Sequence, residues 1–315
     1  MAAVRFCAAD LHSASEIDRQ TTIAIMAHEV KYLVITPVRD EEKHVEATIQ
    51  AVTSQTILPR EWIIVDDGST DKTADIVKHY ATLFPWIHLV SRPNRGSRKS
   101  GGGVVEAFYD GYKTVQYDDW EFIVKLDSDL TFSSDYFEKC FANFESEPSL
   151  GVGGGDIYHN LDGISTVEVN PKFHVRGATK IYRRACWEAI GGLCQAPGWD
   201  TIDEVKANML GWKSHSFSEL HVAHHRFTGT ADGVMRDRIK HGLACYFSGY
   251  HPLFLVASCV SRLIQKPYVA GSAAIGYGFV KGYWTRMPRV NDTQLIKYLR
   301  RQQLRRLCGL ETIWR

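Results

Sequence analysis

Two aspartates one residue apart are the side chains best suited to chemistry in this sequence of 315 residues. Asp127 and Asp129 follow an apolar run, residues 120–124, that predicts a buried strand. Side chains at i and i+2 of an extended chain point the same way, so both carboxylates can converge on one hard cation, Mg²⁺ or Mn²⁺. Such a cation would neutralise charge that builds on a departing diphosphate. An Asp-rich turn without metal is the plainer interpretation, and the neighbouring motifs must decide.

Composition places the chain among folded globular proteins. Hydrophobic residues make up 44% and charged residues 23% of the chain, whose length allows one large domain or two ordinary ones. The net charge of +1 gives no general attraction to nucleic acid, so no nucleic-acid partner is expected. The seven cysteines are odd in number and include no C-x-x-C pair. They favour reduced thiols in a cytosolic compartment over a disulfide framework or a zinc site.

The N-terminal segment, residues 1–29, lacks the pattern of a folded element. Its first 25 residues show no helical or strand periodicity and no apolar core behind basic residues, so a secretory signal is not expected. Met26 comes shortly before the first convincing strand. We therefore expect this segment to be a disordered or non-native extension.

Strand and helix patterns alternate from residue 32 onward. Apolar runs predict strands at 32–38, 61–65, 87–90 and 120–124, and helical spacing appears at 41–52, 71–84 and 105–112. This alternation predicts an α/β fold with a mainly parallel sheet and helices on both faces. Ligands of such sheets bind beyond the carboxyl ends of the strands. Acidic clusters follow three of the predicted strands, so they should meet at that edge.

Four motifs resemble glycosyltransferase family 2, which has the GT-A nucleotide-sugar fold. They are PVRDEE at 37–42, VDDGSTD at 65–71, NRG at 94–96 and LDSD at 126–129, in this order and spacing. The resemblance runs from about residue 31 to residue 242 and places a GT-A catalytic domain at 30–235. It implies an inverting, metal-dependent hexosyltransferase that uses a nucleotide-activated sugar and Mg²⁺ or Mn²⁺.

The resemblance also assigns the nucleotide-sugar site. It implies that Pro37, Arg39, Glu41, Asp66 and Asp67 hold the nucleoside, with Asp127 beside them. This role is chemically reasonable, because a carboxylate accepts hydrogen bonds from a base N–H or a ribose hydroxyl. Capping of the following helix by the residues after Asp67 is compatible with it.

A basic, glycine-rich loop at 95–103 leads into the third predicted helix. Backbone amides at a helix N-terminus favour phosphate, and Arg98 and Lys99 add positive charge for a diphosphate. The loop is neither a Walker A sequence nor a G-x-G-x-x-G turn. A surface loop without a ligand is the alternative.

The predicted general base lies near residue 200. The stretch 197–206 is similar to the acidic helix start of the family, with a glycine eleven residues after Asp200, although Trp199 stands where the family has glutamate. Thr201 and Glu204 form a capping-box pattern, and Asp203 suits the first turn of a helix. Capping leaves Asp200 unexplained, so Asp200 is the predicted base and Asp203 the second candidate.

Two further basic motifs have both a functional and a plain interpretation. Residues 233–242 resemble a degenerate form of the family's acceptor and phosphate motif, in which Arg238 and Lys240 keep the charge. An ordinary solvated basic helix explains them equally well. The histidines at 221–225 offer an imidazole for the metal, and His224 is taken as the third ligand beside Asp127 and Asp129.

The C-terminal region, residues 236–315, changes character. Apolar runs at 252–260 and 268–280 are interrupted by Arg262, Lys266 and Lys281, and thirteen helical residues reach only about 20 Å of a roughly 30 Å hydrocarbon layer. A basic amphipathic tail follows at 295–307. These patterns predict interfacial or re-entrant association with the anionic cytoplasmic face of the cell membrane. Helices packed on the catalytic domain are the alternative.

The expected function is transfer of a sugar from a nucleotide-sugar to an acceptor hydroxyl, on a lipid-linked or saccharide acceptor in cell-envelope polysaccharide synthesis. A sugar-phosphate nucleotidyltransferase is one alternative, but residues 37–40 lack its glycine-rich first loop. A non-catalytic membrane-associated scaffold that keeps the fold is the other.

Overall fold

The computed structural model describes residues 30–96, 102–161, 164–168, 170–195, 198–225, 233–264 and 267–314. The predicted N-terminal extension, residues 1–29, lies outside these ranges. The strands are β1 Tyr32–Val38, β2 Glu61–Asp66, β3 Ile87–Ser91, β4 Phe122–Leu126, β5 Leu130–Phe132, β6 Leu150–Leu161, β7 Ile164–Val167, β8 Thr179–Arg183 and β9 Lys213–His224. The helices are α2 Val45–Thr53, α3 Thr73–Leu83, α4 Gly102–Tyr112, α5 Tyr136–Ser146, α6 Arg184–Ile190, α7 Trp199–Met209, α8 Val234–Phe247, α9 Pro252–Ser261, α10 Tyr268–Trp284 and α11 Thr293–Leu307.

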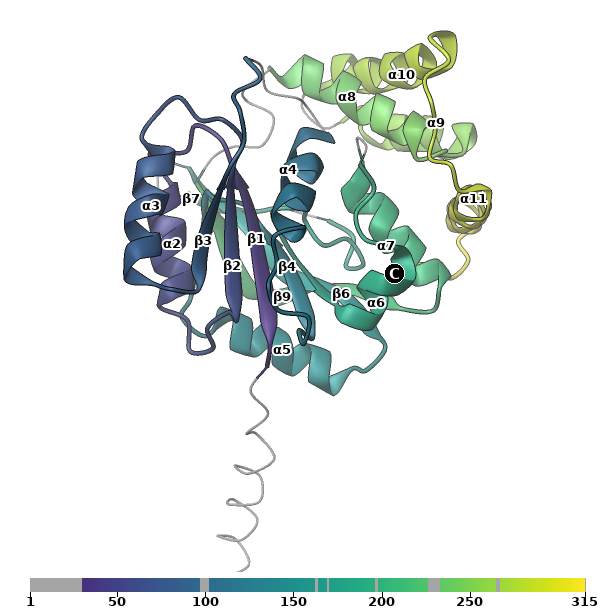
Figure 1. Ribbon diagram of the computed structural model, residues 1–315. Helices are drawn as coiled ribbons and strands as arrows, with labels where there is room; N and C mark the ends of the chain where they lie inside the picture. Colours follow the sequence, from purple (N-terminus) through teal and green to yellow (C-terminus); the bar gives the residue numbers. More distant parts are fainter. Residues whose placement is uncertain are drawn as a thin grey trace, which may run out of the picture.

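The described strands form one sheet in the order β3-β2-β1-β4-β8-β6-β9-β5, with β7 paired to β6 (Figure 1). The first four strands of this order run parallel. β8 is antiparallel to both β4 and β6, whereas β6 and β9 are parallel. β1, β2 and β4 are almost continuously apolar and buried, as expected for strands covered on both faces.

Two hydrophobic clusters cover the two faces of the sheet. α2, α3 and α5 pack on one face through Val45, Val77 and Phe137. α4, α6 and α7 pack on the other through Phe108 and Trp187, among others. Burial of one such apolar side chain stabilises the fold by about 1.5–3 kcal/mol. The α/β arrangement expected from the sequence is present, although β4 begins two residues later than the apolar run suggested.

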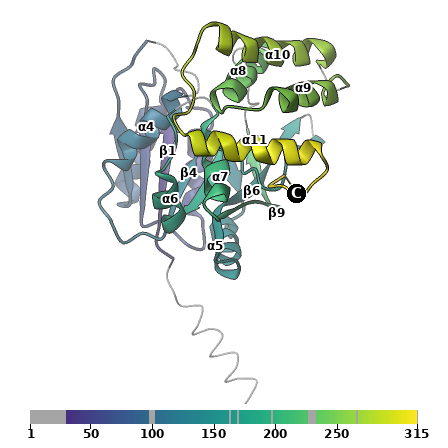
Figure 2. The same ribbon diagram turned by 90° about the vertical axis from the view of Figure 1, so that its right-hand side faces the viewer.

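The helices α8 to α11 lie together beside the carboxyl edge of the sheet (Figures 1 and 2). α8 and α10 approach so closely that a Cβ at Gly242 would lie 2.0 Å from the Ile275 carbonyl oxygen, and one at Gly278 would lie 2.2 Å from that of Ile239. α11 crosses α7, where Leu295 and Leu299 pack on Ile202 and Val205. The expected domain boundary at residue 235, just inside α8, stays a prediction.

None of the described helices combines the length and the apolar character that crossing a bilayer requires. The two apolar runs form α9 and α10, and the basic tail forms α11, close to the predicted bounds.

Candidate active site

The loops after β1 and β2 are joined by hydrogen bonds at the carboxyl edge of the sheet. Arg39 donates to the Asp67 carbonyl oxygen at 3.2 Å and to Asn94 Oδ1 at 3.1 Å. Asp40, which has a φ of 55°, accepts from the Thr70 backbone N–H at 2.8 Å. These hydrogen bonds hold the two loops at a fixed separation. The bond to Asp40 requires this residue to adopt the left-handed conformation, which Asp tolerates better than most residues.

The predicted nucleoside carboxylates lie in these loops and already have partners. Both oxygens of Asp67 accept from guanidinium groups, one from Arg92 and one from Arg95. Asp66 Oδ1 accepts from the Ser69 N–H at 3.0 Å. Glu41 is buried, and its backbone N–H donates to Thr73. Arg92, which no sequence motif indicated, and Arg95 of the NRG motif therefore fix the orientation of Asp67.

The strand register brings Asp127 to the same edge. Ile35 of β1 is level with Lys125 of β4, so Asp127 continues β4 at the height of Pro37. The Lys125 ammonium, itself buried, pairs with Asp127 and also donates to the Gly177 carbonyl oxygen. The Asp127 side chain keeps 31% exposure, which leaves one face of its carboxylate open to a ligand.

Asp129 and His224 form the buried half of the predicted metal site. His224 Nε2 lies 3.2 Å from Asp129 Oδ2, and the side chains are 8% and 5% exposed. His224 Nδ1 is buried without a hydrogen-bond partner. A carboxylate oxygen beside an imidazole suits a divalent cation, but the nitrogen without a partner is Nδ1 and not the Nε2 that faces Asp129. Asp127, Asp129 and His224 therefore stay the predicted ligands, and His224 is the one that they share with the group formed by His159 and Glu168.

A second layer of charged side chains lies behind His224. His159 Nε2 contacts Glu168 Oε1 at 2.9 Å, and the rings of His159 and His224 lie 5.2 Å apart. One ligand atom from each of these three residues lies within 4.8 Å of the other two. Burial alone would raise the pKa of Glu168, but the Arg176 guanidinium and His159 lower it below its ordinary value. Glu168 is thus a carboxylate that can orient His159.

Gly177 joins the metal carboxylates to the predicted base. It accepts from Lys125, and a Cβ on it would lie 2.9 Å from the Trp199 ring and 3.2 Å from Asp200 Cβ. Only glycine allows helix α7 to approach the end of β4 so closely. Asp200 therefore lies beside the Asp127 site, as a general base must.

The charges around Asp200 keep it ionised. Burial alone would raise the pKa of this half-buried carboxyl, but His174, Lys180, Arg176 and Lys125 together lower it below its ordinary value of 3.8. Asp200 is therefore a carboxylate throughout the neutral range and is ready to accept a proton.

Asp203 and Glu204 belong to a buried network instead. Lys180 Nζ, 0% exposed, lies 2.9 Å from Asp203 Oδ2 and 2.8 Å from Glu204 Oε1. Tyr182 donates to Asp203, and His174 Nδ1 lies 2.8 Å from Glu204 Oε2. Burial, together with the Glu204 charge, raises the pKa of Asp203 to about 6. With its carboxylate enclosed by these donors, Asp203 is poorly placed to contact an acceptor.

The capping-box expectation was wrong. α7 begins at Trp199, after Gly198 as its N-cap, so Thr201 lies inside the first turn. The Glu204 carboxylate accepts from the Val175 N–H at 2.7 Å rather than from a helix N-terminus. The reason is tertiary, because Lys180 of the adjacent strand offers a buried charge that a local cap cannot match.

We expect the substitution His174→Gln to remove a pH-dependent part of the stability. Burial lowers the pKa of His174, but the Glu204 carboxylate outweighs this and raises it above 6.5. A raised pKa means that the stabilisation is complete below pH 6.5 and is lost as the pH rises through the folded-state value. His174→Gln should cost about 1.5–3 kcal/mol at pH 6 and less at pH 9, measured by urea unfolding at both values.

The exposed His79 of α3 supplies the matched control, because His79→Gln should leave both unfolding curves in place. An unchanged difference between pH 6 and pH 9 in His174→Gln would contradict the assigned pairing.

The remaining predicted residues are less well placed or lie outside the described ranges. Arg238 and Lys240 are half-buried on α8, and their role with the diphosphate or the acceptor stays a prediction. Arg98 and Lys99 lie outside the described residues. The sequence patterns did not identify Lys125 and Lys180 as partners of the site carboxylates. A lysine inside an apolar strand is the signal that indicates a buried ion pair, and both residues have it.

Comparisons with known proteins show the family of the chain. The family model Glycosyl transferase family 2 matches residues 33–194. The chain belongs to glycosyltransferase family 2. It is 27% identical over 200 residues to the poly-beta-1,6-N-acetyl-D-glucosamine synthase of Staphylococcus epidermidis, a match covering 56% of this chain and 44% of that protein. The match therefore spans less than half of that relative's length.

Two solved structures share the fold. A mannosyltransferase from Pyrobaculum calidifontis, in complex with GDP-Man and Mn²⁺, superposes with a TM-score of 0.55 at 16% identity, over 82% of this chain and 89% of the other. TarS from Staphylococcus aureus, in complex with UDP-GlcNAc, gives 0.50 at 17% identity, over 86% and 80%. These structures confirm the GT-A fold class expected from the sequence.

Proposed function

We propose that this protein transfers a sugar from a nucleotide-sugar donor to an acceptor hydroxyl, with inversion, in the synthesis of a cell-envelope polysaccharide. The observation that carries the proposal is the position of Lys125 and Gly177 between two aspartates: Lys125 pairs with Asp127 and donates to Gly177, against which Asp200 packs. It supports a partly exposed carboxylate for the donor near an ionised carboxylate for the acceptor. Family membership supports the reaction class, and the polysaccharide synthase relative supports the acceptor class.

In this reaction the acceptor oxygen attacks the anomeric carbon as the bond to the diphosphate breaks. Asp200 accepts the acceptor's proton, which makes the oxygen a stronger nucleophile. Arg39 and Asp67 hold the nucleoside at the edge of the sheet, so that the anomeric carbon faces Asp200. Lys125 Nζ lies 5.5 Å from the centroid of the Trp199 ring, a cation–π contact. The ion pair between Lys125 and Asp127 keeps the Asp127 carboxylate oriented toward the donor.

A divalent metal completes this proposal. Asp127, Asp129 and His224 would hold Mn²⁺ or Mg²⁺, which supplies positive charge to the departing diphosphate when bound. The Mn²⁺ in the complex of the mannosyltransferase from Pyrobaculum calidifontis supports this choice, as does the 3.2 Å approach of His224 Nε2 to Asp129 Oδ2.

A donor screen tests the proposed reaction. A donor that binds the folded state at 100 times its Kd should stabilise it by about 2.7 kcal/mol. We expect UDP-GlcNAc, the ligand of the TarS structure, or another nucleotide-sugar to raise the melting temperature with Mn²⁺ present and much less without it. A complete set of nucleotide-sugars that neither stabilises the protein nor is hydrolysed would favour the non-catalytic scaffold.

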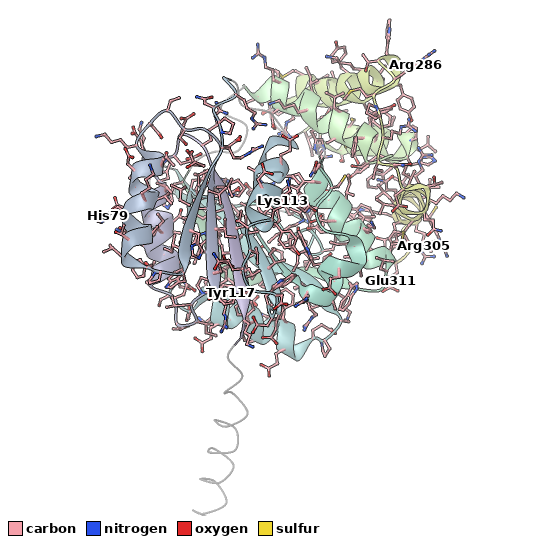
Figure 3. All side chains as sticks on the ribbon, viewed as in Figure 1. His79, Lys113, Tyr117, Arg286, Arg305 and Glu311 are labelled. Atoms are coloured by element: carbon pink, nitrogen blue, oxygen red, sulfur yellow. The ribbon has the colours of Figure 1, made fainter. Side chains whose placement is uncertain are left out.

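The proposed location is the anionic cytoplasmic face of the cell membrane. α9, α10 and the segment between them expose a set of apolar side chains that the other described residues leave uncovered: Leu253, Val256, Val260, Ile264, Val269, Tyr277, Val280 and Trp284. Ile264 and Trp284 are each 85% exposed. The basic residues Lys281 and Arg286 lie on the same helix and its end, and Figure 3 shows Arg286 at the outer tip of this region. An apolar face with basic neighbours suits an anionic bilayer surface.

The double variant Ile264→Asp and Trp284→Asp should lose membrane binding. Each substitution removes an apolar side chain and adds a negative charge, so binding to vesicles with 30% phosphatidylserine should fall by about tenfold or more. Vesicle co-sedimentation measures this. Leu83→Asp is the control, because Leu83 is 57% exposed on α3, at the opposite flank of the molecule. Equal sedimentation of all three proteins would rule out this surface.

A further inference from the structure

Three neighbouring strands bring two histidines and a glutamate together. Tyr158 of β6 is level with Ala223 of β9, so the next residues, His159 and His224, lie side by side. Glu168 directly follows β7, which pairs with β6. Because the paired backbones fix where each side chain begins, the group is built on rigid elements rather than on a loop.

The group is enclosed and compact. The side chains of His159 and His224 are each 8% exposed, and that of Glu168 is 22% exposed. One ligand atom from each residue lies within 4.8 Å of the other two. Ligand atoms that share one zinc ion at about 2.0–2.2 Å lie about 3.0–3.5 Å apart. Small side-chain adjustments therefore suffice to close the group around a cation.

The contact between His159 and Glu168 calls for a cation. His159 Nδ1 lies 3.3 Å from the His224 carbonyl oxygen, which can only accept, so Nδ1 carries a proton. The other nitrogen, Nε2, lies 2.9 Å from Glu168 Oε1. In a neutral imidazole this arrangement directs the Nε2 lone pair at a carboxylate oxygen. Either a proton on Nε2 or a metal ion must offset the repulsion.

His224 favours the metal ion over the proton. Its Nε2 faces Asp129 Oδ2 at 3.2 Å, and its buried Nδ1 has no hydrogen-bond partner among the described residues. A proton on His159 would leave this Nδ1 unsatisfied, at the desolvation cost of a buried polar atom. A metal ion that Nδ1 binds removes this cost and the repulsion together.

The ligand types select the metal. Two imidazoles and one carboxylate suit Zn²⁺, whereas Mg²⁺ prefers oxygen ligands alone. Arg176 Nε pairs with Oε2 of Glu168 at 2.5 Å, which leaves Oε1 on the side of His159. Three protein ligands leave a fourth position of a tetrahedral zinc ion to water.

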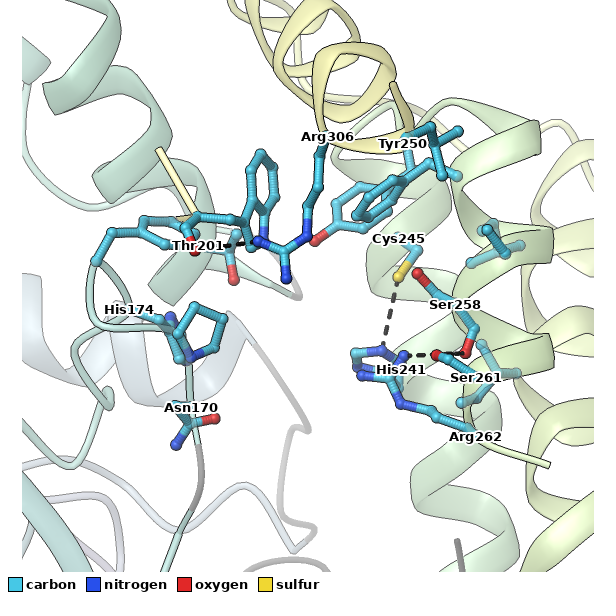
Figure 4. Close-up of a pocket in the computed structure, with 18 residues that line it drawn as sticks. Asn170, His174, Thr201, His241, Cys245, Tyr250, Ser258, Ser261, Arg262 and Arg306 are labelled. Carbon is cyan, nitrogen blue, oxygen red and sulfur yellow. Dashed lines mark hydrogen bonds between the residues drawn. The ribbon is translucent and has the colours of Figure 1, made fainter. Parts of the chain in front are cut away.

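A second pair of histidines lacks these properties. His174 and His241 line a cleft of about 670 Å³, and Figure 4 shows them on opposite sides of it. The described residues that line this cleft include Arg262 and Arg306 but no aspartate or glutamate. Two guanidinium groups without a carboxylate disfavour a cation, so these histidines are not expected to bind zinc.

We propose that His159, Glu168 and His224 Nδ1 bind a Zn²⁺ ion that joins the ends of β6, β7 and β9. The site goes beyond the proposed transfer reaction and does not depend on it. Zinc at Nδ1 leaves Nε2 directed at Asp129, so the ion also fixes the ring that the proposed donor metal uses.

Calorimetric titration of the full chain with Zn²⁺ tests the proposal, after removal of bound metal with EDTA and in excess Mg²⁺. The Mg²⁺ competes at positions rich in oxygen ligands, so the zinc signal reports an imidazole site. We expect one equivalent of Zn²⁺ to bind tightly and X-ray absorption at the zinc edge to show two histidine ligands. A chain that binds no zinc, or a zinc spectrum without imidazole ligands, would overturn the proposal.

Variants locate the ion. Removal of a residue that merely orients a ligand costs about 10- to 100-fold in metal affinity, so His159→Gln and Glu168→Gln should each weaken zinc by about 100-fold or more. His215→Gln is the matched control, because His215 is an exposed histidine on the same strand as His224. Circular dichroism identifies the variants that fold. Unchanged zinc affinity in folded Glu168→Gln and His159→Gln proteins would refute the assignment.

Asp129→Asn separates the zinc site from the proposed donor metal. This variant should keep its zinc affinity while losing the stabilisation by UDP-GlcNAc with Mn²⁺. Zinc binding that is lost in Asp129→Asn but kept in His159→Gln would place the ion at the donor site and overturn the inference.

The two proposals can also fail separately. If no zinc binds while UDP-GlcNAc with Mn²⁺ stabilises the native protein, the zinc site is wrong and the transferase proposal stands. If zinc binds through His159 and Glu168 while no nucleotide-sugar binds, the zinc site stands and the transferase proposal fails.

Discussion

Replacing Asp129 by Asn is expected to lower kcat by about 10³, which corresponds to about 4 kcal/mol of lost transition-state stabilisation. Asp129 is 5% exposed and lies 3.2 Å from His224 Nε2, so the substitution removes the charge of a proposed metal ligand without opening a cavity. Mn²⁺ should stabilise the native protein by about 2.7 kcal/mol at 100 times its Kd. The variant should lose this thermal shift, which gives a readout independent of turnover.

Asp119→Asn is the matched control for this experiment. Asp119 is 44% exposed and pairs with Lys31, so its loss should change neither turnover nor the Mn²⁺ shift beyond the small effect of a surface ion pair. If Asp129→Asn kept both the metal-induced shift and near-normal turnover, the metal would have to bind elsewhere in the protein. His224→Ala would then be expected to behave like the native protein as well.

The strand pattern of the first half was predictable because its strands are covered on both faces. Residues 32–38 and 61–66 are buried almost throughout and are apolar apart from Thr36, Glu61 and Asp66, as is typical of strands covered on both faces. The convergence of the carboxylates followed from topology, since parallel strands end at one edge. The parallel register of β1 with β4 is enough to explain why Asp127 lies level with Pro37.

The partners of the site carboxylates could not be predicted, because they come from distant parts of the chain. Lys180 reaches Asp203 across 23 positions, and His224 reaches Asp129 across 95. A local rule gave the wrong interpretation of Glu204, since the capping-box pattern carries no information about a buried lysine on a neighbouring strand. The sequence could suggest which residue types are reactive, but not which of them the core encloses.

The last helices illustrate a third case, in which one pattern predicted two arrangements that can coexist. The apolar and basic patterns of residues 252–307 predicted either packing on the catalytic domain or a surface for the membrane. The structure shows packing, through Leu295 and Leu299 of α11. It also leaves Val260 of α9 and Trp284 of α10 exposed, because only one face of each helix packs on the rest of the protein and the opposite face meets solvent.

Asp200→Asn should lower kcat by about 10³ while leaving the affinity for the donor unchanged, because a general base contributes about 10²- to 10⁴-fold to the chemical step alone. The pKa of Asp200 lies below 3.8, so the base is ionised over the whole neutral range. The kcat of the native protein should therefore stay flat from about pH 5 to about pH 8 as far as this group is concerned. Initial rates at saturating donor and acceptor measure the kcat of the variant and the pH dependence of the native kcat. The control is Asp75→Asn, since Asp75 is an exposed aspartate of α3.

Asp203→Asn separates the base from its neighbour. Asp203 is 0% exposed and pairs with Lys180, so its loss leaves a buried lysine with one partner fewer and should cost about 3 kcal/mol of stability. The molecules that remain folded should keep near-normal turnover, because Asp203 is enclosed away from the acceptor. A folded Asp203→Asn protein that lost turnover, together with an active Asp200→Asn protein, would move the base to Asp203. The two aspartates thus differ in their contacts: Asp203 holds helix α7 against the sheet through Lys180, and that fixed position presents Asp200, the proposed base.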